Sequence, residues 1–242
     1  MDSRAVLREL EALGTAQNRK VYARHGVGPE MYGVSYAHLG ALKKKIKTDH
    51  ALALELWASG NHDARLLALM IADPARISAR ELDAWVKALD NYVITEAFSR
   101  FAAQTPHARA KMEKWTRAKG EWVGEAGWSL LGALALNDPS LPDAYFQPYL
   151  QIIAADIHRR KNRTRYAMNN ALIAIGVRNA SLQKAALDVA RAIGPVEVDH
   201  GETNCKTPDA VTYIRKTSAH RQKQGAGEKT KQAQRPPRHP AR

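Results

Sequence analysis

An aromatic residue and a carboxylate stand four positions apart at Tyr92 and Glu96. On a helix this spacing puts both side chains on one face. The face of a tyrosine ring attracts positive charge, as a carboxylate does, so the pair is a candidate for stabilising a cation. The alternative is structural: Tyr92 packs at the start of a helix and Glu96 pairs with Arg100, again four positions along.

Lysine and arginine gather in three places near expected helix ends, where the phosphates of a nucleic acid would pass. One run, from His158 to Tyr166, contains no acidic residue and is the strongest candidate for phosphate contact. For the other two clusters a solvated face is an equal alternative. The predicted phosphate-contacting residues are Lys43, Lys44, Lys45, Arg109, Lys111, Arg159, Arg160, Lys161, Arg163 and Arg165.

The overall charge also indicates a polyanionic partner. The chain has 37 Lys and Arg against 24 Asp and Glu, a formal net charge of +13, while its 45% hydrophobic and 25% charged residues are ordinary for a soluble globular protein. Nucleic acid is favoured over a membrane surface because no strongly apolar anchor accompanies the charge. A basic surface without a specific partner is the alternative.

The single cysteine, Cys205, excludes a disulfide framework and a multi-cysteine zinc site. Asp199, His200 and Glu202 lie nearby, but a turn held by hydrogen bonds of Asp199 and Thr203 is favoured, so we expect no metal and no cofactor. The N-terminus is typical of a charged helix start rather than a signal peptide, and no apolar run approaches the roughly 18 residues that span a bilayer. We expect a cytoplasmic, nucleoid-associated protein.

Apolar residues recur at helical spacing almost throughout, which predicts an all-α protein. Short turns join the helices into antiparallel pairs, and such pairs must stack to bury their apolar faces, so an α-solenoid is expected. Gly60 and Asn61 suit a tight turn, and Ser78 with Glu81 forms a capping box. Helices are expected over residues 3–13, 16–25, 35–47, 51–59, 62–72, 78–89, 93–103, 107–118, 121–136, 144–159, 164–177 and 182–193, with a last one from 207 to about 218.

The pattern changes near the C-terminus. Residues 194–207 form an irregular segment, and from Gln222 onward Gln, Gly, Pro, Lys and Arg dominate without an apolar face. That composition is typical of a disordered basic tail. The predicted organisation is one DNA-binding domain over residues 1–218 and a disordered basic tail over residues 219–242.

Several stretches resemble the AlkD-like family of DNA alkylation-repair proteins, alkylpurine DNA glycosylases built from HEAT-like repeats. The resemblance covers roughly residues 16–215 and rests on Tyr32-Gly33-Val34 before a capped helix, on LWASGNHDARLLALMIADP and ELDAWVKALDNY, and on the helix pair with Trp128 and Asn170. The run VDHGETNCKTPDAVTYIRK is similar to one branch of that family. The resemblance implies stacked HEAT-like helix pairs whose concave basic surface binds double-stranded DNA.

The resemblance also implies site residues. The family's central tryptophan and aspartate correspond to Tyr92 and Glu96, so Glu96 is the implied catalytic carboxylate, which stabilises the oxocarbenium charge as a cationic N3- or N7-alkylpurine leaves. Two positions depart from the family: Glu125 replaces an arginine and Asn170 a tryptophan. We expect Glu125 to bond a lysine or arginine of a neighbouring helix. Further candidates for contact with the lesion are Tyr22, Trp122, Trp128 and Asn169, with core packing the alternative for at least one tryptophan.

Three functional hypotheses follow. The first is a DNA glycosylase that hydrolyses the N-glycosidic bond of cationic alkylpurines. The second is a non-catalytic relative that binds damaged or branched DNA through the same surface. The third, a HEAT-like scaffold for protein interactions, is disfavoured by the charge and the resemblance. Glu125 and Asn170 keep the second hypothesis close behind the first, and in each case we expect a monomer.

Overall fold

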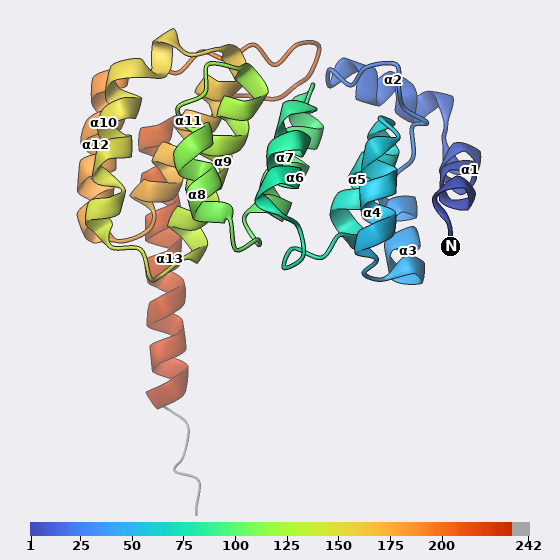
Figure 1. Cartoon of the computed structure of the whole chain (residues 1–242). Coiled ribbons are helices and arrows are strands. Elements are labelled where there is room, and N and C mark those ends of the chain that lie inside the picture. Colours follow the sequence, from blue (N-terminus) through green and yellow to red (C-terminus); the bar gives the residue numbers. More distant parts are fainter. Residues whose placement is uncertain (234–242) are drawn as a thin grey trace, which may run out of the picture.

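The computed structural model describes the backbone of residues 1–233 and the side chains of residues 1–221. Within that range the chain forms only helices and their connecting segments, and helix pairs stack into a curved array (Figure 1), which confirms the predicted all-α solenoid. The helices are α1 (Ser3–Leu13), α2 (Ala16–Arg24), α3 (Tyr36–Ile46), α4 (His50–Ala58), α5 (His62–Ile71), α6 (Ala79–Lys87), α7 (Tyr92–Ala102), α8 (Ala108–Trp115), α9 (Glu121–Asn137), η1 (Asp143–Tyr145), α10 (Gln147–Asp156), η2 (Ile157–Arg159), α11 (Asn162–Gly176), α12 (Ala180–Ile193) and α13 (Ala210–Ala233).

The middle of the array has two layers. The outer helices α4, α6, α8 and α10 are each followed by an inner helix, α5, α7, α9 or α11. The inner helices contact one another in that order. Their N-terminal ends therefore lie along one edge, at the top of Figure 1. We call the turns at this edge, residues 59–61, 88–91, 116–120 and 160–161, the upper rim.

Local sequence explains where the inner helices begin. The side chain of Asn61 accepts hydrogen bonds from the first turn of α5, and that of Asn91 accepts one from the first turn of α7. Gly60 has φ +78°, a conformation that suits glycine at the tight turn before α5. The predicted capping box of Ser78 and Glu81 starts the outer helix α6. Polar side chains thus fix the two turns of the upper rim that precede α5 and α7.

Aromatic side chains join consecutive helix pairs. The rings of Trp57 and Trp85 stack with centroids 4.3 Å apart, and Phe98 lies 6.3 Å from Trp57 and 5.6 Å from Trp115. All four are buried. Because they come from α4, α6, α7 and α8, the core is continuous from one pair to the next.

A buried carboxylate fixes the connection into α3. Asp63, which is fully buried, accepts hydrogen bonds from the backbone N–H groups of Tyr32, Gly33 and Val34 at 2.7, 3.0 and 2.9 Å. The hydroxyl of Tyr22 donates to the Val34 carbonyl at 2.6 Å. These bonds hold α2 and α3 against the N-terminal end of α5.

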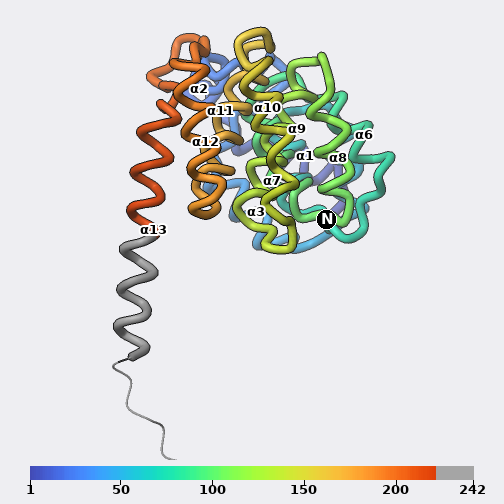
Figure 2. Tube along the Cα trace, turned by 90° about the vertical axis from the view of Figure 1, so that its left-hand side faces the viewer, coloured from blue at the N-terminus to red at the C-terminus, as the bar shows by residue number. Residues whose placement is uncertain are grey.

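Residues 194–209, which we call the crossing segment, run from the end of α12 back along the top of the molecule toward α2 (Figures 1 and 2). Asn162 and Asp199 exchange two hydrogen bonds at 2.7 and 2.8 Å. Asp199 also accepts from the N–H of Gly201, and Thr203 accepts from the N–H of Cys205. The predicted turn held by Asp199 and Thr203 is therefore confirmed.

The last helix differs from its prediction at both ends. Helix α13 begins after Asp209, which caps the N–H of Thr212 at 2.8 Å, and it continues to Ala233 rather than ending near Ser218. Its early part packs on α11 and α12, with Ile214 fully buried. The helix thus covers residues 219–233 of the predicted tail, a stretch without an apolar face. Residues 234–242 of that tail lie outside the described part.

Candidate functional site

Tyr92 and Glu96 lie on the same face of α7, as the spacing predicts, and both line a cavity of about 440 Å³ on the concave side. Side chains from α2, α3, α11 and the crossing segment complete its walls. Glu96 keeps 41% of its side chain exposed. We call this space the concave cavity.

Arg163, in the first turn of α11, fills the centre of the site. Its guanidinium carbon lies 4.1 Å from the ring centroid of Tyr92 and 4.5 Å from that of Tyr166. The same terminal nitrogen, Nη2, is 3.5 Å from Glu96 and 3.3 Å from Glu125. Two aromatic faces and two carboxylates therefore surround one cation, of which only 8% is exposed.

The start of α9 positions Arg163. Glu121 accepts a hydrogen bond from the backbone N–H of Arg163 at 2.7 Å, and its carbonyl accepts one from the hydroxyl of Thr164 at 2.9 Å. A side chain at Gly124 would come within 2.8 Å of Thr164 Oγ1, so only glycine permits this approach of α9 and α11. The close contact brings Glu125 beside Arg163.

Glu125 is 1% exposed, and burial raises its pKa to about 8 even though Arg163 opposes the shift. The nearby Glu96 carboxylate raises this pKa further. Oε2 of Glu125 has no hydrogen-bond partner among the described residues. One guanidinium cannot neutralise two carboxylates, and a proton on Glu125 leaves the cluster without net charge. The expectation that Glu125 bonds a cation of a neighbouring helix is confirmed.

Histidines that the sequence pattern did not single out for this cavity extend it. His25, directly after α2, hydrogen-bonds the hydroxyl of Tyr92, and the ring of His200 meets that of Tyr166 edge-on with centroids 5.4 Å apart. Tyr166 itself follows Arg163 by three positions, a helical spacing that would have grouped them. No local spacing signals His25 or His200, because α2 and the crossing segment reach the cavity from opposite ends of the chain.

Four predicted contact residues are corrected by burial. Lys111 donates to the Ala79 carbonyl at 2.6 Å inside the α6–α8 contact, and Arg163 is enclosed as described, so neither side chain presents its charge at the surface. Trp128 and Asn169 are fully buried and do not reach the concave surface. Asn169 instead donates to the Pro208 carbonyl at 2.9 Å, which anchors the end of the crossing segment.

The remaining lesion-contact candidates stay near the concave side. Tyr22 lines the concave cavity, although its hydroxyl is engaged with Val34. Asn170 lines an adjoining space of about 310 Å³, which shares Glu96 with the concave cavity. Trp122 is partly buried against the core.

The predicted cations separate into two edges. Arg159 and Lys161 are exposed beside the upper rim, and Arg160 and Arg165 are partly buried there. The exposed Arg117 and Lys119, which were not predicted, join them at the turn before α9. Lys43, Lys44 and Lys45 end α3 at the opposite edge, because the next N-cap, at residue 49, bonds the C-terminal end of α5. Arg109 opens α8, beyond the C-terminal end of α7.

The upper rim also collects partial positive charge. The N-terminal end of an α-helix carries about half an elementary charge, and four inner helices direct that end toward this edge. Arginine and lysine side chains at the same edge add full charges. The arrangement suits a row of phosphates.

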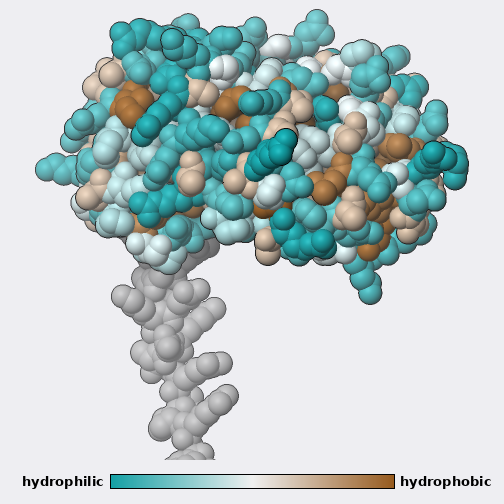
Figure 3. Space-filling view, viewed as in Figure 1, coloured by the Kyte–Doolittle hydropathy of each residue, from teal (hydrophilic) through white to brown (hydrophobic). Residues whose placement is uncertain are grey.

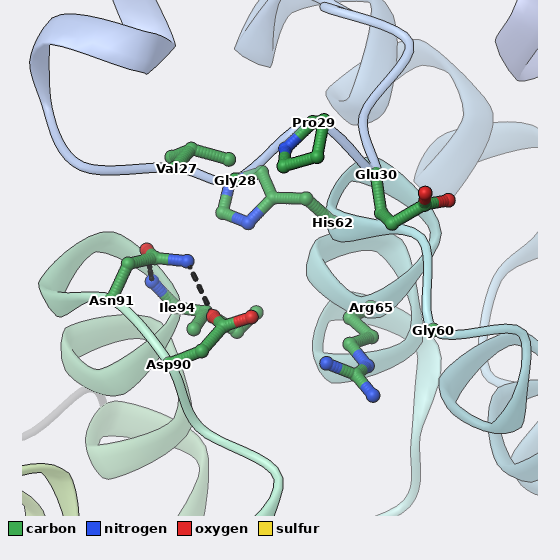
Figure 4. Close-up of a pocket in the computed structure, with 10 residues that line it drawn as sticks. All are labelled: Val27, Gly28, Pro29, Glu30, Gly60, His62, Arg65, Asp90, Asn91 and Ile94. Carbon is green, nitrogen blue, oxygen red and sulfur yellow. Dashed lines mark hydrogen bonds between the residues drawn. The ribbon is translucent and has the colours of Figure 1, made fainter.

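A smaller cavity of about 90 Å³ lies between the turn before α3 and the starts of α5 and α7 (Figure 4). His62 faces it with Nε2 unpartnered among the described residues, and burial lowers the pKa of this imidazole. Asp90 accepts a hydrogen bond from Asn91 at 2.7 Å on the opposite wall. Its size and mixed charges distinguish it from the concave cavity, and we assign it to packing between helix pairs.

Comparisons with known proteins identify the fold family. A family model described as DNA alkylation repair enzyme matches residues 6–214. The chain belongs to this family. A solved structure from a family related to the HEAT-like repeat DNA glycosylases, with affinity for branched DNA structures, is similar with a TM-score of 0.82 and 30% identity, over 91% of this chain and 95% of that one.

Two further relatives, uncharacterized proteins of Listeria innocua and Listeria monocytogenes, are each 28% identical over 214 residues, which is 86% of this chain and 93% of theirs. The resemblance stated from the sequence is thereby confirmed at the level of the family and its HEAT-like fold. In the described part of the chain, no helix has the length and apolar character to cross a membrane.

Proposed function

We propose that the protein binds duplex and branched DNA along the upper rim and the concave side, and that it does so without excising bases. The observation that carries the second half is the placement of Arg163 against Tyr92, Glu96 and Glu125.

DNA binding is supported by the charge of the protein and by its similarity to known proteins. The net charge of +13, the exposed cations beside the upper rim and the four helix N-termini all favour phosphate. The family is one of DNA alkylation repair, and the similar solved structure comes from proteins with affinity for branched DNA. A protein-interaction scaffold would require none of these features.

Absence of base excision is supported by what occupies the site. A cationic alkylpurine would have to stack on Tyr92 and approach Glu96, and a guanidinium already does both. Arg163 is internal, and two carboxylates and two rings hold it, so a base of single charge gains little by displacing it. The guanidinium acts as a built-in substitute for the lesion.

Glycosylase activity is the second candidate, favoured by one observation. Glu96 is still 41% exposed and faces the concave cavity beside Tyr92. In that case Arg163 replaces the family arginine that the chain lacks at Glu125, and Glu96 acts electrostatically on the deoxyribose.

Base release decides between the two. Duplex DNA with 7-methylguanine is incubated with the wild-type protein, and free base is measured against a protein-free control. We expect free base to appear at the same rate with the wild-type protein as in the protein-free control. Release by the wild type that disappears in Glu96→Gln, with DNA binding retained, would establish the glycosylase instead.

Binding is tested separately by titrating labelled duplex at several salt concentrations. Each phosphate neutralised contributes about −0.9 to the slope of log K against log salt, so affinity falls steeply with salt. Lys161→Ala weakens binding and makes the slope shallower by about 0.9, whereas Lys44→Ala, the same charge change at the opposite edge, has little effect. An affinity that does not change with salt concentration would contradict the proposed DNA binding.

A further inference from the structure

The outer face carries a groove that the concave site does not use. It has a volume of about 540 Å³ and lies between the later part of α8 and the segment formed by η1 and α10. The rings of Tyr145 and Tyr149 line it, with centroids 5.8 Å apart, together with Pro148 and Ile152. We call it the outer groove.

Arginine side chains accompany these rings. The guanidinium of Arg109 lies 4.7 Å from the ring centroid of Tyr145, and Arg117 and Arg160 line the outer groove itself. Arg117 is exposed and has no ion-pair partner among the described residues. An aromatic pair flanked by arginines is the composition of surfaces that bind single-stranded nucleic acid.

The acidic residues of the outer groove are already neutralised. Glu113 pairs with Arg109 at 3.3 Å and accepts a hydrogen bond from the Tyr145 hydroxyl at 2.8 Å. Asp156 pairs with Arg159 at 2.6 Å and with Arg160 at 3.5 Å. The negative charge of the groove is therefore balanced, and Arg117 adds a positive charge, unpaired within the described part of the chain, beside the apolar rings.

The outer groove continues into the upper rim. Arg160 lines the groove and also directly follows η2, at the turn where α11 begins. A nucleic acid strand can thus pass from the rim over this turn without leaving basic surface. The surrounding face is largely hydrophilic with small, separate hydrophobic patches (Figure 3), unlike a broad apolar interface for a protein partner.

We propose that the outer groove binds unpaired nucleotides, namely the single-stranded arm of a branched DNA whose duplex lies along the upper rim. The bases stack on Tyr145 and Tyr149, and Arg117 and Arg160 contact the phosphates. Stacking on aromatic rings accepts every base, so the arm is held without regard to sequence. This inference rests on the proposed DNA binding and adds a second site to it.

Three fluorescent probes test it by anisotropy at one salt concentration: a blunt duplex, the same duplex with a single-stranded thymidine flap of about eight nucleotides, and the flap oligonucleotide alone. We expect the flapped duplex to bind more tightly than the blunt one. Tyr149→Leu and Tyr145→Leu each lower affinity for the flapped duplex about tenfold and leave the blunt duplex unchanged.

Matched variants separate stacking from folding. Tyr145→Phe keeps the ring and retains the flap preference. Arg117→Ala changes one exposed side chain and lowers flap affinity, whereas Lys184→Ala on α12, which does not line the outer groove, does not. Thermal unfolding by circular dichroism checks that every variant is folded.

Two results overturn the inference while leaving duplex binding intact: equal affinity of the wild type for blunt and flapped duplex, or equal losses on both probes in Tyr149→Leu and Tyr145→Leu. Failure to bind the blunt duplex at all contradicts the proposed function. In that case the single-stranded oligonucleotide decides. If it binds and the binding depends on Arg117 and Tyr145, the outer groove remains supported as a nucleotide site. If it does not bind, the inference is wrong.

Discussion

Two clusters in this molecule combine carboxylates with basic side chains, but the carboxylate pKa is lowered in one and raised in the other. Between α6 and α8, one carboxylate, Asp83, receives Lys111 at 2.9 Å, Lys114 at 2.8 Å and the indole N–H of Trp115 at 3.2 Å. Hydrogen bonds from these three groups lower its pKa to about 2 despite partial burial. On the concave side, two carboxylates share Arg163, and burial raises the pKa of Glu125 to about 8.

The difference indicates that two properties decide whether a carboxylate in such a cluster stays ionised: the ratio of cations to carboxylates and how deeply the carboxylate is buried. Asp83 has cations in excess and remains ionised in the folded protein, so its cluster serves as a fixed clamp between two outer helices. The concave cluster has carboxylates in excess around one enclosed cation, so it can take up a proton and is the more sensitive of the two to substitution.

The largest effect is expected from Arg163→Ala. Removing the shared cation leaves two carboxylates facing each other, one of them fully buried, and breaking a buried ion pair typically costs about 3–5 kcal/mol. Urea unfolding at pH 9, above the pKa of Glu125, measures the loss, which is smaller at pH 5 because Glu125 is then protonated. A loss of the same size at both pH values would contradict the shared-cation description.

An intermediate effect is expected from Lys111→Met. Methionine keeps the buried stem beside Trp115, but the Ala79 carbonyl and Asp83 lose a donor, which costs about 1–2 kcal/mol in the free energy of unfolding. Lys114→Met is the matched control: this lysine binds the same carboxylate but is 63% exposed, so its loss is within about 0.5 kcal/mol. Equal losses would mean that burial does not set the strength of the clamp.

The last two predictions concern slopes of stability against pH, which have opposite signs. The pKa of Glu125 is raised in the folded state, so its protonation contributes stability below the unfolded value of 4.5, and this contribution is lost as pH rises toward about 8. The free energy of unfolding of the wild type relative to Glu125→Gln therefore falls across that window.

For Asp83 the pKa is lowered, so its contribution is present above the unfolded value of 3.8 and is lost as pH falls toward about 2. The difference in the free energy of unfolding between the wild type and Asp83→Asn therefore decreases in acid and does not change with pH above pH 5. Urea titrations at a series of pH values measure both differences. Slopes of the same sign in the two pairs would refute the comparison.

Local patterns predicted most of the fold because they encode caps and turns directly. Ser35 and Ser78 each cap the helix expected to begin there, and most helix ends fall within one or two residues of prediction. Helix α13 was predicted too short because residues 219–233 lack an apolar face, the signal that bounded the other expected helices.

The same reasoning predicted only part of the site. The four-residue spacing placed Tyr92 beside Glu96 because both belong to α7. The enclosure of Arg163 depends instead on how closely α7, α9 and α11 approach, which the absent side chain of Gly124 permits and no spacing along the chain records. A run of cations was therefore interpreted as surface, although one of its members, Arg163, is enclosed at the centre of the site.

The crossing segment changes how the solenoid should come apart. In an array where each helix pair touches only its neighbours, stability is nearly a sum of local terms, and the ends can fray independently. Here the segment after α12 is bonded to Asn162 and also shares a cavity wall with α2, so late residues support early ones. This connection between the two ends favours a single cooperative melting transition over stepwise loss of repeats.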